Sequence, residues 1–273
     1  MKQVVLIFFA LCLGCYASIA QSDVSVKKTL KLMGTRFEIT VVAPNEDIGY
    51  ININEAVAEI QRIEKLISSW DADSETSKIN KNAGIRPVRV SQELFELIER
   101  ALALSQVTDG AFDITYASLD KVWRFDGTMT TAPSESEIAH SVAKIGYEKV
   151  ILNSASQSIF LTEKGMRIGF GAIGKGYAAD KAKALLVSKE VKAGIINASG
   201  DLTTWGTKSN GENWMVGITN PLEKEKVFAW LPVIESSVAT SGNYEKFLSF
   251  GGEKYSHRSE EHTSELQSRP HIS

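Results

Sequence analysis

The order in which helical and strand patterns follow one another most constrains the fold of this chain. Residues 53–70 place Ile53, Val57, Ile60, Ile63 and Ile67 at helical spacing, so one face of a helix is expected to be buried. Residues 29–43 are typical of a strand or hairpin arm, and short strand patterns dominate after residue 149. Because helices and strands do not alternate strictly, the pattern predicts an α+β fold rather than a doubly wound parallel sheet.

Start and stop signals define two more helices. Ser91 can cap a helix that Asp109 and Gly110 would end. Ser134 can cap another, with Glu137 completing a capping box, and Gly146 is its expected end.

The first 20 residues are typical of a signal for export. Lys2 precedes an apolar run that is too short for a comfortable membrane span, which favours a signal peptide over residues 1–20. Small residues at Ser18 and Ala20 suit ordinary cleavage, whereas "LCLGC" resembles a lipobox ending at Cys15. Lipidation there would anchor the protein to the inner membrane. A buried N-terminal helix is the alternative, and export would make the protein periplasmic.

Composition and motifs exclude several functional classes. The formal net charge is −3 and no basic cluster carries interleaved aromatics, so a nucleic-acid partner is not expected. Both cysteines lie within the export signal, so no disulfide framework or cysteine metal site is expected after cleavage. The sequence contains neither a nucleophile elbow with a catalytic triad nor a His-Glu-x-x-His zinc motif.

A glycine-rich segment, "GFGAIGKGYAADKA", begins at Gly169. Its spacing matches that of a phosphate loop up to Lys175, but Gly176 occupies the position at which such a loop needs a magnesium-binding hydroxyl. Glycines and a helix N-terminus let backbone N–H groups approach an anion, and Lys175 would add a positive charge. The alternative is a tight strand-to-helix turn with a surface lysine.

Three further stretches carry polar groups beside small residues. Phe112 and Asp113, in "DGAFDIT", could stack on and bond to a heteroaromatic ring, or could be a core residue and a helix cap. Asn197 and Asp201 lie at a strand end, where such residues mark a turn or a ligand site. Ser241, in "ATSGNYEKF", supplies a hydroxyl in a similar turn.

Taken in order, the motifs "MGTRFEIT", "SETSKIN", "GAFDIT", "AIGKGYAAD", "NASGD", "ATSGNYEKF" and "YSH" closely resemble the ApbE family of FAD:protein FMN transferases. The resemblance covers residues 33–257. It implies mixed or antiparallel sheets flanked by helices, with an FAD cleft between two halves, in a domain over residues 21–257.

The resemblance implies a reaction and its partners. Members of the family are exported, cleave FAD at its pyrophosphate and attach FMN to a threonine of an acceptor protein, releasing AMP. Acceptors include subunits of electron-transfer complexes. Magnesium is required, which suits a reaction that builds charge on a leaving phosphate. The glycine-rich segment would then hold the pyrophosphate side of a flavin dinucleotide.

The resemblance also implies site residues. Ala172 would offer its backbone carbonyl to magnesium, and His257 would assist proton transfer from the threonine, for which an imidazole is suited. The residues expected at FAD share positions in the quoted motifs or beside them: Met33, Trp70, Ala111, Phe112, Asp113, Gly169, Lys175, Asn197, Asp201 and Ser241.

Two departures from the family pattern affect these expectations. The family often has an acidic residue at the position of Gly169. After "YSH" it continues with an "HIIDPxTG"-like stretch and a later Asp and Thr that bind magnesium, whereas this chain continues with "RSEEHTSELQS". We therefore expect residues 258–273 to be a non-native or disordered tail, the C-terminal part to be missing, and this chain to be inactive or weak. The alternatives are a non-catalytic periplasmic flavin-binding protein and an FAD pyrophosphatase.

Overall fold

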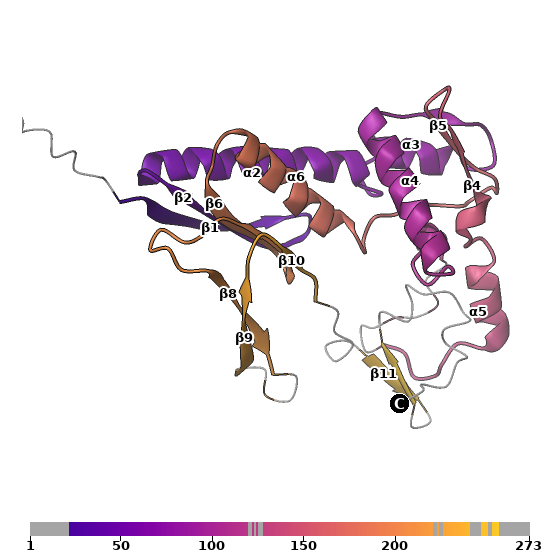
Figure 1. The fold of residues 1–273 in the computed structure, drawn as a ribbon. Coiled ribbons are helices and arrows are strands. Elements are labelled where there is room, and N and C mark those ends of the chain that lie inside the picture. The colour runs from indigo at the N-terminus through magenta and orange to yellow at the C-terminus, as the bar shows by residue number, and fades with distance from the viewer. Residues whose placement is uncertain are drawn as a thin grey trace, which may run out of the picture.

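The computed structural model describes residues 22–119, 122, 124, 128–220, 223, 226–240, 247–250 and 253–256 (Figure 1). The expected export signal, Ser241, His257 and the expected tail lie outside the described residues. Among the helices that are described, none combines the length and apolarity needed to cross a bilayer.

The described chain forms two halves, and a five-stranded sheet is the centre of the first. Its strand order is β1-β2-β6-β7-β10, and every neighbouring pair is antiparallel. The strands are β1 (Val24–Leu32), β2 (Thr35–Ala43), β6 (Ala193–Ala198), β7 (Asp201–Trp205) and β10 (Ser237–Val238). The pairing of β2 with β6, with Phe37 opposite Ala198, joins segments that are far apart in the sequence.

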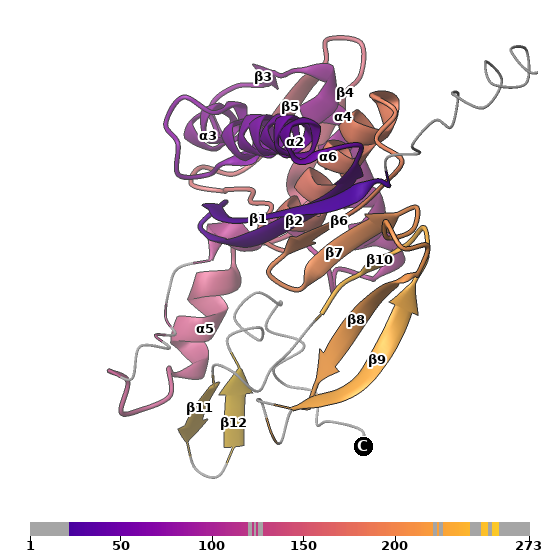
Figure 2. The ribbon, with the colours of Figure 1, turned by 90° about the vertical axis from the view of Figure 1, so that its left-hand side faces the viewer.

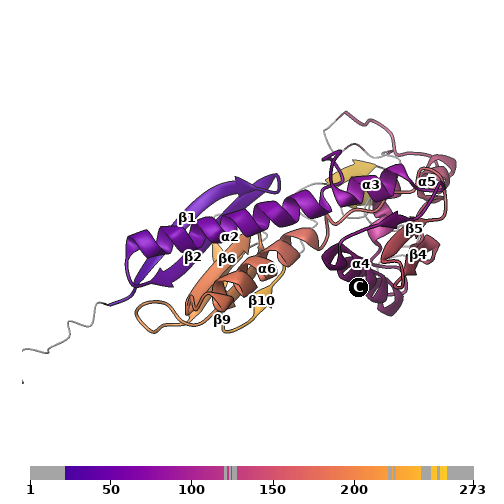
Figure 3. The ribbon, with the colours of Figure 1, turned by 90° about the horizontal axis from the view of Figure 1, so that it is seen from above.

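Helices α2 (Glu46–Ile67) and α6 (Gly174–Ser188) lie side by side on one face of this sheet (Figure 3). The buried face of α2 includes the isoleucines whose spacing predicted the helix. The buried residues of α6 are smaller, mainly alanines, which lets its backbone approach closely. Helix α2 begins at Glu46, earlier than its apolar spacing indicated, because the Asn45 side chain accepts the Ile48 N–H and caps the helix there.

The second half lies beyond the C-terminal end of α2 (Figure 1). It contains a three-stranded antiparallel sheet in the order β3-β5-β4. Its elements are α3 (Glu75–Lys81), β3 (Val88–Arg89), α4 (Gln92–Val107), the 3₁₀ helices η1 (Ile114–Ser118) and η2 (Tyr147–Lys149), α5 (Glu135–Val142), β4 (Val150–Asn153) and β5 (Ser158–Leu161). One apolar core runs through both halves. The predicted α+β class with antiparallel sheets is confirmed.

The predicted caps of α4 and α5 are present. The Ser91 side chain accepts an N–H of the first turn of α4, and the chain leaves that helix through left-handed residues at Asp109 and Gly110. Ser134 and Glu137 form the predicted capping box of α5. This helix ends at Val142, about one turn before the expected glycine.

Two ribbons lie apart from the main sheet (Figure 2). One pairs β8 (Trp214–Thr219) with β9 (Val227–Val233), and the other pairs β11 (Phe247–Phe250) with β12 (Glu253–Ser256). Several large apolar side chains of the β8–β9 ribbon are exposed, among them Phe228 and Trp230.

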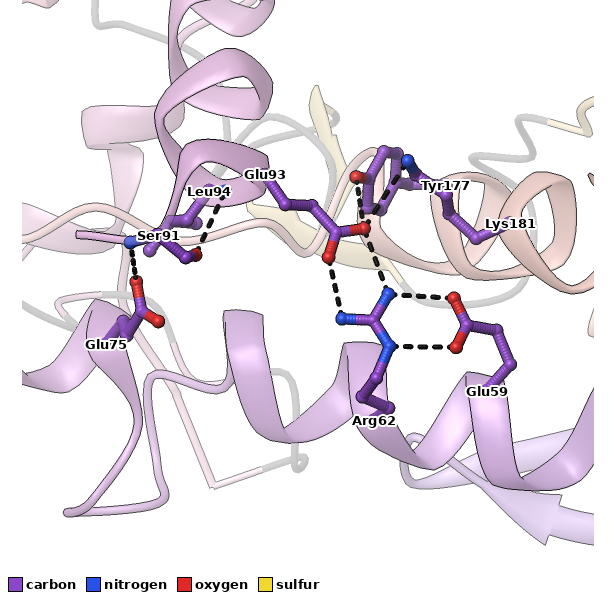
Figure 4. Close-up of polar contacts among 8 residues, drawn as sticks. All are labelled: Glu59, Arg62, Glu75, Ser91, Glu93, Leu94, Tyr177 and Lys181. Carbon is purple, nitrogen blue, oxygen red and sulfur yellow. Dashed lines mark hydrogen bonds and ion pairs between the residues drawn. The ribbon is translucent and has the colours of Figure 1, made fainter. Parts of the chain in front are cut away.

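A network of charged groups joins three helices (Figure 4). Arg62 on α2 donates to Glu59 at 2.8 Å and to Glu93 of α4 at 2.6 and 3.0 Å. On α6, the Tyr177 hydroxyl donates to Glu93 at 3.0 Å, and the Lys181 ammonium lies 3.4 Å from the same carboxylate. The hydrogen bond from Arg62 is the main reason that the pKa of Glu93 falls to about 2. Glu93 therefore links α2, α4 and α6.

We predict that Glu93→Gln lowers the free energy of unfolding by about 1 kcal/mol at pH 7, a modest amount because Arg62 is about half exposed. The folded-state pKa lies below the ordinary value of 4.5, so this stabilisation is present above about pH 4.5 and is lost as pH falls towards 2. Urea denaturation of both proteins from pH 7 to pH 2.5 measures the difference. Glu99→Gln, on the exposed side of the same helix, is the control. A difference that stays constant with pH would contradict the prediction.

Candidate functional site

Two pockets lie on either side of the segment that leads into α6. Pocket A has a volume of about 560 Å³ and is lined by Met33, Glu64, Trp70, Tyr116, Phe170 and Lys175, among others. Pocket B has a volume of about 340 Å³, and its lining includes Leu97, Ala172, Ile173, Gly176, Tyr177 and Asp201. The structure thus brings Met33, Trp70 and Lys175, which the family resemblance implied as site residues, to one pocket, and places Ala172 and Asp201 in the other.

Pocket A is walled on one side by the turn between β1 and β2. Met33 and Gly34 have positive φ angles of 49° and 74°, as a tight hairpin turn requires. The Met33 N–H donates to the Glu64 carboxylate at 3.1 Å, and its side chain packs partly against the core. The turn is therefore fixed to α2, and Met33 forms part of the pocket wall.

Trp70 lies just beyond the end of α2. The Ser68 hydroxyl accepts the backbone N–H of Trp70 at 3.2 Å and that of Asp71 at 3.0 Å. Trp70 is 80% exposed. An indole held by its backbone at the rim of a pocket is a group on which a flat ring can stack.

Tyr116 explains two of the four glycines in the segment from Gly169 to Gly176. The Gly171 N–H donates to the Tyr116 hydroxyl at 3.0 Å, and a Cβ at Gly171 would overlap that hydroxyl. A Cβ at Gly169 would lie 3.0 Å from the Ala117 Cβ and 3.3 Å from the Tyr116 hydroxyl. The absence of side chains at these glycines therefore leaves room for η1, and the Gly171 N–H already has a hydrogen-bond acceptor within the protein.

The remaining two glycines differ from each other. A Cβ at Gly174 would lie 2.7 Å from the Ile67 Cδ1, so this glycine allows α6 to pack on α2. A Cβ at Gly176 would meet nothing within 4 Å, and Gly176 lines pocket B. Gly176 is thus the glycine of this segment whose missing side chain leaves open space in a pocket.

An ion pair joins a residue of pocket A to a residue of pocket B. The Lys175 ammonium lies 2.9 Å from the Asp201 carboxylate and 3.4 Å from the Ala198 carbonyl oxygen. Lys175 lines pocket A, and Asp201 lines pocket B. Asn197 holds the turn that leads to Asp201, because its side-chain oxygen accepts the Gly200 N–H at 2.9 Å.

The structure gives the segment from Ala111 to Asp113 a local structural role. Asp113 is buried and accepts both the N–H and the hydroxyl of Thr115 at 2.7 Å, and Thr115 in turn accepts the Gly146 N–H at 2.9 Å. Burial raises the pKa of Asp113. Phe112 packs partly on the core. In the part of the chain that the structure describes, none of the three lines pocket A or pocket B, and their role towards FAD stays a prediction.

Two polar residues of pocket A, Tyr116 and Glu64, are among those that sequence reasoning missed. Tyr116 follows the "GAFDIT" motif directly, and this position was the available signal. Glu64 lies in the last turns of α2, where nothing in the sequence distinguishes it from other solvent-facing carboxylates. Ser241 and His257 lie outside the described residues, so their predicted roles stay predictions.

Comparison with known proteins gives consistent matches. The profile of the ApbE family matches residues 33–266. An FAD:protein FMN transferase of Klebsiella pneumoniae is 34% identical over 199 residues, covering 72% of this chain and 61% of that protein. One from Treponema pallidum is 28% identical over 219 residues, covering 75% and 60%. The chain therefore spans about three fifths of the length of these curated relatives.

Solved structures agree with the sequence matches. The crystal structure of the ApbE protein from Thermotoga maritima superposes with a TM-score of 0.75 at 29% identity, covering 86% of this chain and 77% of that one. The apo flavinyl transferase ApbE of Pseudomonas stutzeri has a TM-score of 0.72 at 24% identity, covering 86% and 73%, and supports the fold.

We predict that Gly171→Ala lowers the free energy of unfolding by about 1–3 kcal/mol, because the new methyl group overlaps the Tyr116 hydroxyl. Gly176→Ala is the matched control and should raise it by up to about 1 kcal/mol, since alanine favours the helix and meets open space. In a Tyr116→Phe background the cost of Gly171→Ala should shrink, because the nearest ring atom would then lie 3.5 Å away. Urea denaturation of the double-mutant cycle measures this coupling. Equal costs in both backgrounds would contradict it.

Proposed function

This chain belongs to the ApbE family, and we propose that it carries out the reaction named for its relatives, the transfer of FMN from FAD to a protein. The acceptor would be a threonine hydroxyl. Its oxygen forms a bond to the phosphorus of the FMN half, the pyrophosphate P–O bond breaks, and AMP leaves. The threonine proton passes to a base, for which His257 is the candidate.

The observation that carries this proposal is the composition of pocket A. Three segments far apart in the sequence give it a thioether at Met33, an exposed indole at Trp70 and an ammonium group at Lys175. The first two suit the flat ring of a flavin, and the third suits a phosphate. Phosphoryl transfer is accelerated mainly by positioning and by positive charge placed near the transferred group.

We include magnesium in the proposal because of the chemistry of the reaction. When bound, it would neutralise the charge that develops on the departing phosphate. In pocket B the oxygen donors include the Ala172 main chain and the carboxylates of Asp180 and Asp201, of which Asp201 already pairs with Lys175. A hard cation needs about six oxygen ligands, and the described residues contain no group of three or more carboxylate, imidazole or thiol side chains placed to hold one, so they do not fit the ion by themselves. We therefore derive no step through the ion.

The cellular setting also belongs to the proposal. The apolar N-terminal run supports export to the periplasm, with Cys15 as a lipid-anchoring residue on the inner membrane. The acceptor would be a flavoprotein subunit of an electron-transfer complex. Labelling with a radioactive fatty acid in cells would test the anchor, and Cys15→Ser would be the control.

We predict that the full chain, mixed with FAD, magnesium and an acceptor domain, adds FMN to the acceptor threonine and releases AMP only at a low rate, because of its departures from the family motif. Mass spectrometry of the acceptor and chromatography of the nucleotides measure both products, and an acceptor with that threonine replaced by alanine is the control. Free FMN and AMP with an unmodified acceptor would instead identify a pyrophosphatase. Bound FAD without AMP would identify a flavin-binding protein. The same assay decides whether activity is as weak as the departures from the family motif suggest.

We further predict that a chelator abolishes AMP release and that added magnesium restores it. The measurement is the initial rate of AMP release before and after addition of EDTA, with FAD binding followed in parallel by flavin fluorescence. A rate that chelation leaves unchanged would refute the magnesium requirement without touching the assignment of pocket A.

A further inference from the structure

We propose that Asp201 is a positioning residue that holds Lys175 between the two pockets and releases it when the pyrophosphate of FAD enters. This inference rests on the proposed function, because it assigns a second state to a lysine of that site. The ion pair is then an exchangeable contact. Lys175 bonds to Asp201 before FAD binds and to phosphate oxygens afterwards.

The first support is the place of the pair. The Lys175 ammonium and the Asp201 carboxylate are 2.9 Å apart, yet each lines a different pocket. Lys175 is in the first turn of α6, and Asp201 is the first residue of β7. A small rotation of the lysine side chain therefore moves its charge from one pocket wall to the other, while both backbones stay in regular structure.

The second support is the difference in rigidity between the two partners. Asp201 follows a fixed turn, in which Ser199 and Gly200 have positive φ angles of 57° and 100° and Asn197 binds the Gly200 N–H. Lys175 has a long flexible side chain whose other contact is a 3.4 Å bond to the Ala198 carbonyl oxygen. The carboxylate is thus the stationary partner, and the ammonium is the one that can change partners.

The third support is the degree of exposure. The side chains of Lys175 and Asp201 are 30% and 17% exposed, so the pair is partly shielded but within reach of an entering ligand. A pair in this setting is weak enough for a doubly charged pyrophosphate to replace it. A carboxylate that competes for the lysine weakens binding of the anion.

The test compares Asp201→Asn with wild type, using the full chain. We expect the variant to bind FAD about threefold to tenfold more tightly, because the competing carboxylate is gone, and inorganic pyrophosphate should gain by a similar factor. Its affinity should also fall more steeply with added salt. The rate of FMN transfer at saturating FAD should stay within about twofold, because Lys175 has already moved from Asp201 to the phosphate oxygens in that state. A merely structural aspartate would not tighten the binding of both anions when it is replaced.

Glu55→Gln is the matched control. Glu55 accepts the Lys189 ammonium at 2.6 Å at the far end of α6, so the same loss of a lysine partner occurs away from both pockets. This variant should leave the affinity for FAD and pyrophosphate unchanged. An Asp201→Asn protein with wild-type thermal stability and unchanged or weaker affinity for both ligands would overturn the proposal.

Two further measurements keep the proposal testable. If Asp201→Asn does not fold, Asp201→Glu retains the charge and moves the carboxylate by one methylene. We expect it to keep FAD affinity within about twofold, whereas tighter binding would overturn the proposal. If the wild type binds FAD but transfers no FMN, the proposed function fails while the binding comparison still decides the role of Asp201.

Discussion

The contact between Gly174 and Ile67 sets the geometry on which both pockets depend. Because Gly174 has no side chain, the first turn of α6 lies directly against the last turn of α2, with the Met33 methyl group close by. The β1–β2 turn, the end of α2 and the start of α6 therefore meet at one point. Lys175 follows Gly174, so this contact also fixes where the lysine backbone lies relative to Met33 and Trp70.

The charged network around Glu93 supports the same arrangement from the other side. Arg62 and Tyr177 reach Glu93 from α2 and α6, and Tyr177 also lines pocket B (Figure 4). Its hydroxyl donates to Glu93, so the ring is held in one orientation at the pocket wall. An interaction that joins helices thereby also shapes the pocket beside the Lys175–Asp201 pair.

Local patterns predicted much of the fold, and motif order predicted the family. Ser91 and Ser134 marked helix starts because side-chain caps act over a few residues and are visible in sequence. The purpose of the glycines was not visible in the same way. The spacing left open whether the glycines approach a phosphate or form a tight turn. In the structure, the absence of side chains at Gly169 and Gly171 leaves room for Tyr116, and its absence at Gly174 leaves room for Ile67. Such contacts join residues far apart in sequence, and spacing alone does not reveal them.

The close approach of Tyr116 to the glycine-rich segment has an evolutionary consequence. A relative with an acidic residue at the position of Gly169 would need room where Tyr116 and Ala117 lie in this protein. The side chains at 116 and 117 would then have to shift by a few tenths of an ångström or be replaced. We therefore expect substitutions at 116, 117 and 169 to be coupled, and covariation among the three positions would reveal how this branch of the family diverged.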